Sequence, residues 1–247
     1  MDDIGSEKVR RAKEDETYTI NVGHDRWAMD QVLVYFFAFG EDNLTDQLVS
    51  RFPAIAKIIQ DQYENQIDAT AYLGGLNNIA VNAIREKMGC YLKVPVDYKI
   101  VVEEDETIWL KRETDAATTN ILMHHLPYRS QDQFSKEFII GLRDSLGKKL
   151  ISSTIEGSYM RTNPIDLPVF TQSIQLANNY TLEARGIWEM EGDFLGGPFL
   201  SYLILDEKNE SLVFVDAFVL APSERKRNMM LSLEHIISSI ELESGTN

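Results

Sequence analysis

The segment Arg185–Phe199, RGIWEMEGDFLGGPF, holds the densest group of residues that could carry chemistry. Side chains along a β-strand alternate between its two faces, so Glu189, Glu191 and Asp193 would share one face, opposite Trp188. Three carboxylates on one face could bind a cation, or could act as a general acid and a general base. The segment therefore suggests one class of enzyme, a carboxylate-dependent hydrolase.

The same segment also fits a structural interpretation. Its carboxylates would lie on a solvated strand face, followed by a bulged, glycine-rich turn that lets Pro198 re-enter the sheet. Glycine tolerates positive φ and the close approach of another chain. Because the chain contains 39 Asp and Glu residues, an acidic strand face needs no function, and we favour this interpretation. The segment then contributes a candidate interaction surface: Arg185, Trp188, Glu189, Glu191, Asp193, Gly196, Gly197 and Pro198.

Three successive cations, Arg225, Lys226 and Arg227, form a second unusual feature. We expect the final helix to begin after Pro222 with Ser223 as its N-cap, which places these cations in the first turn. Cations there oppose the helix dipole, so a negative group should lie nearby. That group is either a surface carboxylate of this chain or an acidic or phosphorylated partner. The second alternative adds the three cations to the candidate interaction surface.

Other side chains provide no catalytic or metal site. The single cysteine, Cys90, excludes an internal disulfide, a CxxC redox pair and a thiolate zinc site, and we expect it to be an inert buried thiol. His124 and His125 are adjacent on a predicted strand, so they point to opposite faces and do not share a metal. Motifs for dinucleotides, P-loops, zinc proteases and serine hydrolases are absent. We predict no catalytic residue, no cofactor and no metal.

The charge of the chain argues against two classes of partner. Lys and Arg number 24 against 39 Asp and Glu, a formal net charge of −15. Nucleic acids and anionic membrane surfaces attract basic proteins, so we expect neither to bind. The longest apolar run, Val32–Phe39, is far shorter than the roughly 20 residues of a membrane helix, so no transmembrane segment is predicted. The polar first residues hold no secretory signal, and the chain taken alone would be cytoplasmic.

Hydrophobic patterning predicts an α+β fold. Val32–Phe39 forms a buried strand, and an apolar helical stripe follows it from Leu44 to Tyr63, with a kink or break expected at Pro53. The middle and the last third of the chain are rich in strands, with one helix between them at 134–150 and another at the end. We expect antiparallel sheets with amphipathic helices packed on one face.

The same pattern suggests the domain organisation. Residues 1–16 are highly charged and are expected to form a disordered tail. Residues 17–247 then form a single α+β domain, or two lobes at 17–89 and 90–247.

Two stretches of the chain resemble each other. Phe37–Ile59 and Phe218–Ile240 align without a gap, each as a strand, a short cap and an amphipathic helix. One explanation is a duplicated ferredoxin-like unit with an incomplete first half. The other is that any strand–helix pair has this pattern.

Several short strings make the sequence similar to a known family. The most specific is GDFLGGPF at Gly192–Phe199. The others are Trp27-Ala28 with Gln31, Ile108–Leu110, Pro127-Tyr128 with Phe134, Arg143-Asp144, Gly157–Met160, Arg185–Trp188, and Ala221-Pro222 with Lys226-Arg227 and Glu234. Over about Tyr18–Leu242 the chain resembles an uncharacterised family of Bacteroidetes proteins, a domain of unknown function that carries a GDxxGGPF string.

The resemblance implies a location but no activity. Members of the family are described as lipoproteins, which implies a cell-envelope protein on the periplasmic side of the outer membrane. A lipid on an N-terminal cysteine would tether it, and this chain does not carry that cysteine. Members also look longer at the N-terminus by about one strand–helix unit, which is why the first half of a duplication would be incomplete here.

Three functions are compatible with the sequence. The favoured one is a non-catalytic cell-envelope protein that binds or scaffolds an envelope protein through the candidate interaction surface. The second is a hydrolase that uses Glu189, Glu191 or Asp193, which requires these carboxylates to line a concave pocket. The third is a small-ligand carrier that holds its ligand between the sheet and Trp188, which requires an apolar pocket.

Overall fold

The computed structural model of this chain describes residues 18–38 and 40–243, together with residues 10 and 14. It divides into two compact units, residues 1–70 and 71–247, which are described separately. Apart from residues 10 and 14, the expected tail lies outside the described residues.

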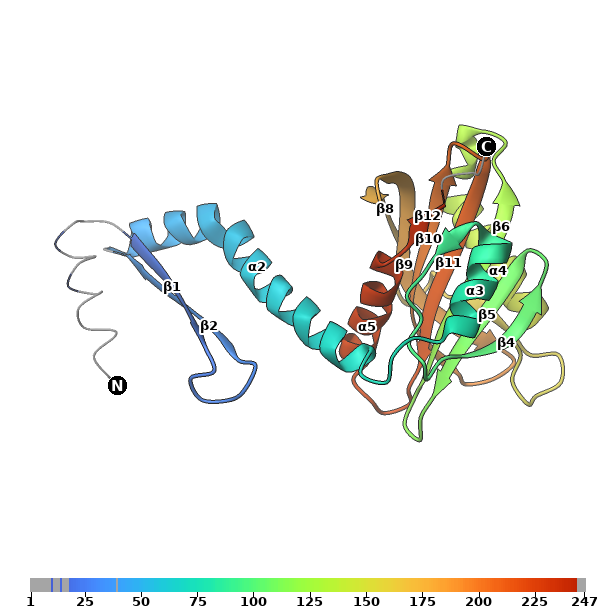
Figure 1. The fold of residues 1–247 in the computed structure, drawn as a ribbon, viewed down its shortest axis with the longest axis horizontal. Coiled ribbons are helices and arrows are strands. Elements are labelled where there is room, and N and C mark those ends of the chain that lie inside the picture. Colours follow the sequence, from blue (N-terminus) through green and yellow to red (C-terminus); the bar gives the residue numbers. More distant parts are fainter. Residues whose placement is uncertain (1–9, 11–13, 15–17, 39, 244–247) are drawn as a thin grey trace. The chain divides into compact units, whose positions relative to one another are not determined.

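The first unit is a β-hairpin followed by a long helix (Figure 1). Strands β1 (Tyr18–His24) and β2 (Val32–Ala38) pair antiparallel, and α2 spans Glu41–Ala71. Pro53 lies inside α2 without ending it. The segment is therefore one helix, and the predicted alternative of two helices separated at Pro53 is wrong. No helix in the described residues is both long and apolar enough to cross a membrane.

The second unit contains three helices and an extended sheet. The helices are α3 (Asn78–Met88), α4 (Lys136–Leu150) and α5 (Arg227–Ser238), with a short 3-10 helix η1 at Gln131–Gln133. The strands are β3 (Cys90–Tyr91), β4 (Lys99–Glu104), β5 (Thr107–Glu113), β6 (Thr118–Pro127), β7 (Tyr159–Thr162), β8 (Phe170–Leu176), β9 (Asn179–Glu191), β10 (Gly196–Asp206), β11 (Ser211–Leu220) and β12 (Glu241–Leu242).

Eight of these strands form one antiparallel sheet. Its order is β4-β5-β6-β11-β10-β9-β7, and β8 also pairs with β9. The outer side of β9 is shared, because β8 pairs with its first half and β7 with its last four residues. The short strands β3 and β12 pair separately. The prediction of an α+β protein with an antiparallel sheet is therefore confirmed.

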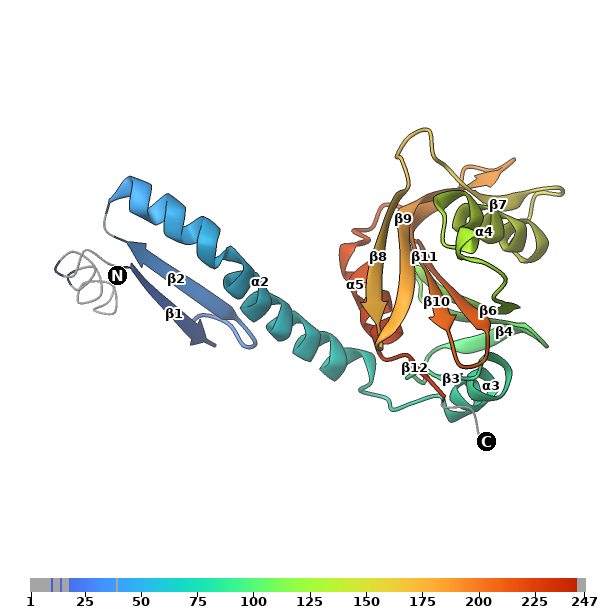
Figure 2. The same cartoon turned by 90° about the horizontal axis from the view of Figure 1, so that it is seen from above.

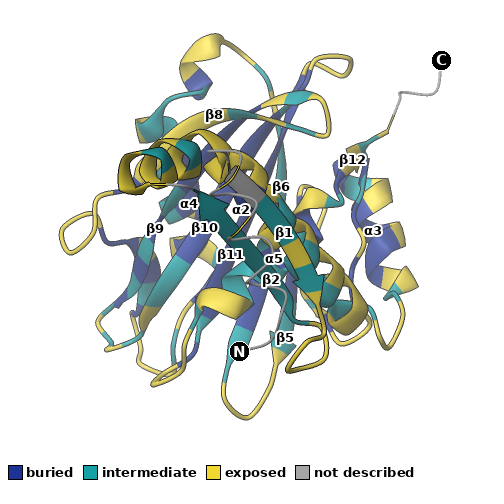
Figure 3. Cartoon of the chain, turned by 90° about the vertical axis from the view of Figure 1, so that its left-hand side faces the viewer, coloured by how far each residue is buried: buried dark blue, intermediate teal, exposed yellow. Residues whose placement is uncertain are grey.

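Helices cover both faces of this sheet rather than one. Helices α3 and α5 bury apolar side chains such as Ile84 and Ile236 against one face. Helix α4 buries Ile139 and Leu146 against the other face, beside Phe214 of β11. The central strands β10 and β11 are consequently buried from both sides, as the colouring in Figure 3 indicates. Their long apolar runs reflect burial on two faces.

The sheet curls around α4 (Figure 2). A Cβ on Gly147 would lie 2.6 Å from the carbonyl oxygen of Met160, so α4 packs directly on β7 at one edge of the sheet. Lys149, the penultimate residue of α4, forms a 2.7 Å ion pair with Glu104 of β4 at the opposite edge. One helix can contact both edge strands only if the sheet bends around it.

Helix α5 begins later than the sequence predicted. Ser223 has a φ of 65° and does not cap the helix, whose first residue is Arg227. Lys226 occupies the N-cap position and makes no side-chain cap hydrogen bond. By contrast, α3 is capped at both ends: the side chain of Asn77 accepts a hydrogen bond from the amide of Ala80, and Gly89 ends the helix at a φ of 62°.

The two similar stretches of sequence fold as strand–helix pairs in different settings. The first corresponds to β2 and α2, where β2 pairs with β1 in a two-stranded sheet. The second corresponds to β11 and α5, where β11 lies at the centre of the eight-stranded sheet. The arrangement differs from a repeated ferredoxin-like unit, because the second unit is built around one curled sheet.

We predict that the Cys90 thiol is inert in the folded protein. Cys90 has no exposed surface, and burial, followed by the nearby charge of Glu243, raises the pKa of its thiol to about 12. Since only the thiolate reacts, alkylation by iodoacetamide at pH 8 should be slower by about a thousandfold than after unfolding in urea. Mass spectrometry would measure both rates, and comparable rates would contradict the buried position of this thiol.

Candidate functional site

The structure places the candidate residues of β9 and β10 on two different faces of the sheet. Trp188 is 3% exposed and lies on the α4 face, where its Nε1 donates a 3.3 Å hydrogen bond to the carbonyl oxygen of Val219 and its ring meets Phe218 edge-on. Trp188 is therefore a core residue. A ligand held between the sheet and its ring would have to displace this packing.

The glycines of the segment provide space for that tryptophan. A Cβ on Gly197 would lie 2.0 Å from the carbonyl oxygen of Val219 and 3.2 Å from Trp188 Nε1. A Cβ on Gly196 would lie 2.8 Å from the carbonyl oxygen of Trp188. Pro198 follows directly and is paired with Ile187 across the hairpin. The Gly-Gly-Pro run thus lets β10 pass close to the end of β11.

Arg185 lies on the other face and links the sheet to α5. It forms ion pairs with Glu183 (2.7 Å) and with Glu234 of α5 (2.5 Å). Arg185 donates hydrogen bonds to both carboxylates, and these bonds, above all the one to Glu183, raise the pKa of its guanidinium. Burial alone would raise the pKa of Glu183, but hydrogen bonds from Arg185 and Gln172 outweigh it and leave that pKa below its usual value. The charges of this cluster are satisfied within the fold.

Glu189 and Glu191 are bound by a neighbouring arginine. Arg161 of β7 lies 2.7 Å from Glu189 and 3.0 Å from Glu191, and Asn163 donates a 2.7 Å hydrogen bond to the second oxygen of Glu189. The hydrogen bond to Glu189 raises the pKa of Arg161. Both carboxylates thus hold β7 against β9, which is a structural role. The sequence did not reveal Arg161 as their partner.

The turn between β9 and β10 presents a fully exposed aromatic ring. Gly192 has a φ of 82°, and the Asp193 side chain accepts a 2.7 Å hydrogen bond from the amide of Phe194. Two backbone hydrogen bonds, from Met190 to Leu195 and from Asp193 to Met190, close the turn. Phe194 itself has a relative exposure of 106%. The sequence-based surface included Asp193 but omitted Phe194, although a Gly-Asp pair predicts a turn that lifts the next side chain from the sheet.

A second loop and the cationic segment lie at the same end of the sheet. The loop before β7 touches the turn, because a Cβ on Gly192 would lie 3.9 Å from Ser158, and this loop carries Ile155, which is 48% exposed. Gly197, near the start of β10, lies against Val219, near the end of β11. The chain continues from Val219 into the segment that carries the cations from Arg225 onward. We call Phe194, Ile155 and the Arg225–Arg227 segment the hairpin-tip surface.

The cationic segment is arranged differently from the prediction. Arg225 precedes α5 and is exposed, Lys226 is the N-cap, and Arg227 is the first helical residue. The Lys226 ammonium donates a 3.0 Å hydrogen bond to the carbonyl oxygen of Glu224, which partly offsets the unfavourable interaction with the helix dipole. Three positive side chains therefore lie at the start of α5, and those of Arg225 and Arg227 are exposed.

A fully buried polar network lies on the α4 face. Arg143 of α4 is 1% exposed; its Nε lies 3.0 Å from Asp216 Oδ1 in β11, and its guanidinium carbon lies 3.9 Å from the centre of the Phe199 ring. Ser201 donates a 2.6 Å hydrogen bond to the same Asp216 oxygen, while Asp216 Oδ2 has no hydrogen-bond partner among the described residues. Burial raises the pKa of Asp216 despite the nearby charge of Arg143.

A family model identifies this unit. It matches residues 77–239 and describes a domain of unknown function, DUF4837. The chain belongs to the DUF4837 family. The DUF4837 match begins at the cap of α3 and ends after α5, so it includes every residue of the candidate interaction surface and the buried Arg143–Asp216 pair.

Other comparisons with the DUF4837 protein are distant. No curated protein matches it in sequence. The Ran-binding protein Mog1p of Saccharomyces cerevisiae is similar in structure at a TM-score of 0.38 and 10% identity, covering 62% of this chain and 90% of Mog1p. Human STARD10 is similar at a TM-score of 0.30 and 8% identity, covering 65% of this chain and 74% of STARD10.

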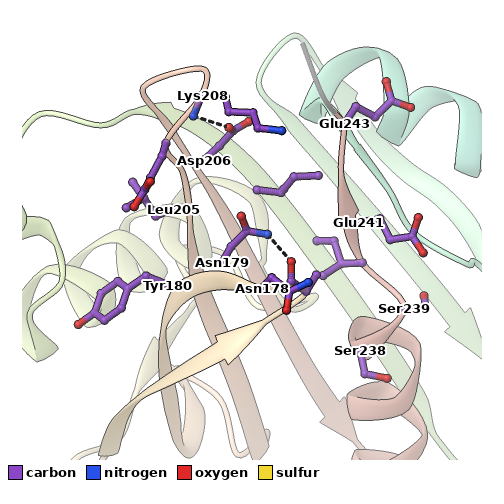
Figure 4. A pocket seen from close by; sticks show the side chains of 14 residues that line it. Asn178, Asn179, Tyr180, Leu205, Asp206, Lys208, Ser238, Ser239, Glu241 and Glu243 are labelled. Carbon is purple, nitrogen blue, oxygen red and sulfur yellow. Dashed lines mark hydrogen bonds between the residues drawn. The ribbon is translucent and has the colours of Figure 1, made fainter.

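The DUF4837 protein also has a surface pocket of about 660 Å³ (Figure 4). The β8–β9 turn, the β10–β11 turn and the end of α5 with β12 line it, and none of the candidate interaction residues does. Asp206 in this pocket accepts hydrogen bonds from the amides of Lys208 and Asn209, and Glu243 forms a 2.6 Å ion pair with Arg85. These carboxylates are already used by the fold.

No metal site is formed by the DUF4837 residues that the structure describes, since no three His, Cys, Asp or Glu side chains converge on one point. His124 faces Thr107 at 2.9 Å, and burial lowers the pKa of its ring. The side chain of the adjacent His125 lies on the opposite face of β6. The backbone amide of His125 donates a hydrogen bond to the carbonyl oxygen of Glu106.

Proposed function

We propose that this protein is a non-catalytic binding protein that docks a partner protein through the hairpin-tip surface. The observation that carries the proposal is the fully exposed ring of Phe194, which a hydrogen-bonded turn holds away from the sheet. Moving an exposed aromatic side chain from water into an apolar pocket is favourable by about 2–3 kcal/mol. A complex in which a partner pocket buries the Phe194 ring would be stabilised by about that amount. Because the turn is already ordered, little conformational entropy is lost on binding.

The chemistry around the ring indicates what kind of partner fits. Ile155 adds apolar surface beside the turn, and Arg225 and Lys226 add positive charge at the same end of the sheet. The chain as a whole has a net charge of −15, so this positive region is a local exception. A partner with an apolar pocket and an acidic rim would match both features, since aromatic anchors and arginine are typical of interface hot spots.

The location of this binding follows from the family resemblance. The partner is a cell-envelope protein, and the protein acts on the periplasmic side of the outer membrane, held there by a lipid anchor. The support for this part is the resemblance to proteins described as lipoproteins, together with the overall charge, which disfavours nucleic acid as a partner.

The two alternative functions find less support at the residues first considered for them. Arg161 and Asn163 bind Glu189 and Glu191, and these carboxylates do not line the pocket described above. Trp188 fills the space in which a ligand carrier of the kind first considered would hold its ligand.

The proposal predicts which variants lose the partner. Full-length protein with its native N-terminus would be used for affinity capture from the native cell envelope, followed by quantitative mass spectrometry. Phe194→Ala should reduce recovery of the partner by about tenfold or more, because an anchor residue typically contributes over 1–2 kcal/mol. Arg225→Glu should also weaken capture, and more strongly at low salt.

Ile165→Ala is the matched control, because Ile165 is 87% exposed but follows β7 on a separate loop. It should capture the partner as the unmodified protein does. Equal recovery by the Phe194→Ala and Ile165→Ala variants would remove the hairpin-tip surface as the docking site.

A further inference from the structure

Strand β8 is an open edge of the large sheet. It pairs with β9 along one side, from Phe170 opposite Arg185 to Leu176 opposite Asn179, and within the described part of the chain no strand pairs with its other side. Figure 2 shows it as the outermost strand beside β9. An edge strand exposes unpaired backbone N–H and C=O groups that readily pair with another strand.

The other edges of this sheet have the protections that β8 lacks. Strand β4 carries Lys99, Glu103 and Glu104, and its register with β5 shifts between Ile100 and Val102. Strand β7 is four residues long and contains Arg161. Charges, bulges and short length all discourage pairing at an edge.

Strand β8 instead has the sequence FTQSIQL, with no charge and no proline, in a chain of which 26% of residues are charged. Its pairing register with β9 is regular throughout. Nothing in its composition or geometry opposes the addition of another strand.

The polar and apolar residues of β8 suit antiparallel pairing with an identical strand. If a two-fold axis passes through Ser173, Phe170 of one copy lies opposite Leu176 of the other, and Thr171 lies opposite Gln175. The outer pairs then match, apolar with apolar on the α5 face and polar with polar on the α4 face, and such matches stabilise cross-strand pairs. Gln172 lies opposite Ile174 on the α5 face, which is the one mixed pair. A shift by one residue would destroy this match.

We infer that two copies of this chain pair through their β8 strands about a two-fold axis at Ser173, so that the two sheets become one continuous sheet. The matched Phe170–Leu176 and Thr171–Gln175 pairs indicate a second copy as the occupant, and the absence of charge on β8 lets that copy approach here. Each copy has a net charge of −15, so most of its surface repels another copy, whereas β8 is an uncharged edge at which the two backbones can approach. This pairing is independent of the hairpin-tip surface.

Sedimentation equilibrium of the full chain over a range of concentrations tests the inference. The unmodified protein should reach twice its 28.2 kDa mass at high concentration. Thr171 and Gln175 are both exposed, so charges can be placed there without disturbing the core. The Thr171→Lys/Gln175→Lys variant puts two lysine pairs across the axis and should raise the dimer dissociation constant roughly tenfold or more.

The matched variant Thr171→Lys/Gln175→Glu tests the register. It places a lysine opposite a glutamate at both positions, so it should dimerise at least as tightly as the unmodified protein. A monomer at every concentration, or a dimer that the paired lysines do not weaken, would overturn the inference. A charge-matched variant that dissociates as readily as the double lysine variant would overturn it as well.

Discussion

Replacing Arg143 by methionine should destabilise the protein by about 3–5 kcal/mol, because it leaves a buried carboxylate without its positive partner. Arg143 and Asp216 are 1% and 0% exposed, and Arg143 is the cation that contacts this carboxylate. Methionine retains much of the packing volume, so lost charge dominates the effect. Urea unfolding followed by circular dichroism would measure the change in the free energy of unfolding.

The dependence on pH and a second variant identify the cause. In the Arg143→Met protein the pKa of Asp216 should rise further, so its carboxyl binds a proton more readily in the folded than in the unfolded state. Stability then increases as pH falls, and the deficit should be smaller at pH 5 than at pH 8. The double variant Arg143→Met/Asp216→Leu should recover most of the loss, since both charges are gone. A deficit below about 1 kcal/mol would show that the pair is not buried as described.

Replacing Gly197 by alanine should cost about 3 kcal/mol of stability, the upper part of the range for overpacked sites. The new Cβ would lie 2.0 Å from a backbone carbonyl oxygen of β11, so β10 must move away from β11 or Trp188 must leave its position. Neither neighbour is a flexible side-chain end that could turn aside. Thermal unfolding together with the fluorescence of Trp188 would record both the loss and the displacement.

Gly141→Ala is the control for this variant. Gly141 lies on the exposed side of α4, and apart from its chain neighbours and the backbone of its own helix no atom lies within 4 Å of the position that an alanine methyl group would take. Alanine at this position should stabilise the protein by about 0.5–1 kcal/mol, because it reduces the freedom of the unfolded chain and suits a helix. If Gly197→Ala were equally neutral or stabilising, close packing would not be the reason for the glycine.

Local pattern was enough to predict most of the elements in the second unit. Alternation in β9 placed Trp188 opposite Glu189 and Glu191, which is how the structure has them. The patterning also predicted a helix at 134–150, and α4 spans Lys136–Leu150. The start of α5 was misplaced, because Ser223 is a common N-cap residue but here takes a left-handed conformation in the loop.

Local sequence pattern could not predict ion pairs between residues that are far apart in the sequence. Arg161 binds Glu189 from 28 residues away, and Arg185 reaches Glu234 across 49 residues. Arg143 and Asp216 are separated by 73 residues and meet only because α4 packs across the curled sheet. Charged residues are mostly exposed in folded proteins, so the residue types alone do not point to a buried pair. Phe194 was missed for the opposite reason, because an aromatic residue is expected in the core.

The central claim is that Phe194 enters a pocket on a partner protein, and site-specific photo-cross-linking tests it most directly. A benzophenone amino acid would replace Phe194 in one version of the full-length protein and Ile165 in another, and both would be irradiated in the native cell envelope. We predict that position 194 forms a cross-link to one envelope protein and that position 165 does not. No cross-link from position 194, or the same product from both positions, would contradict the claim.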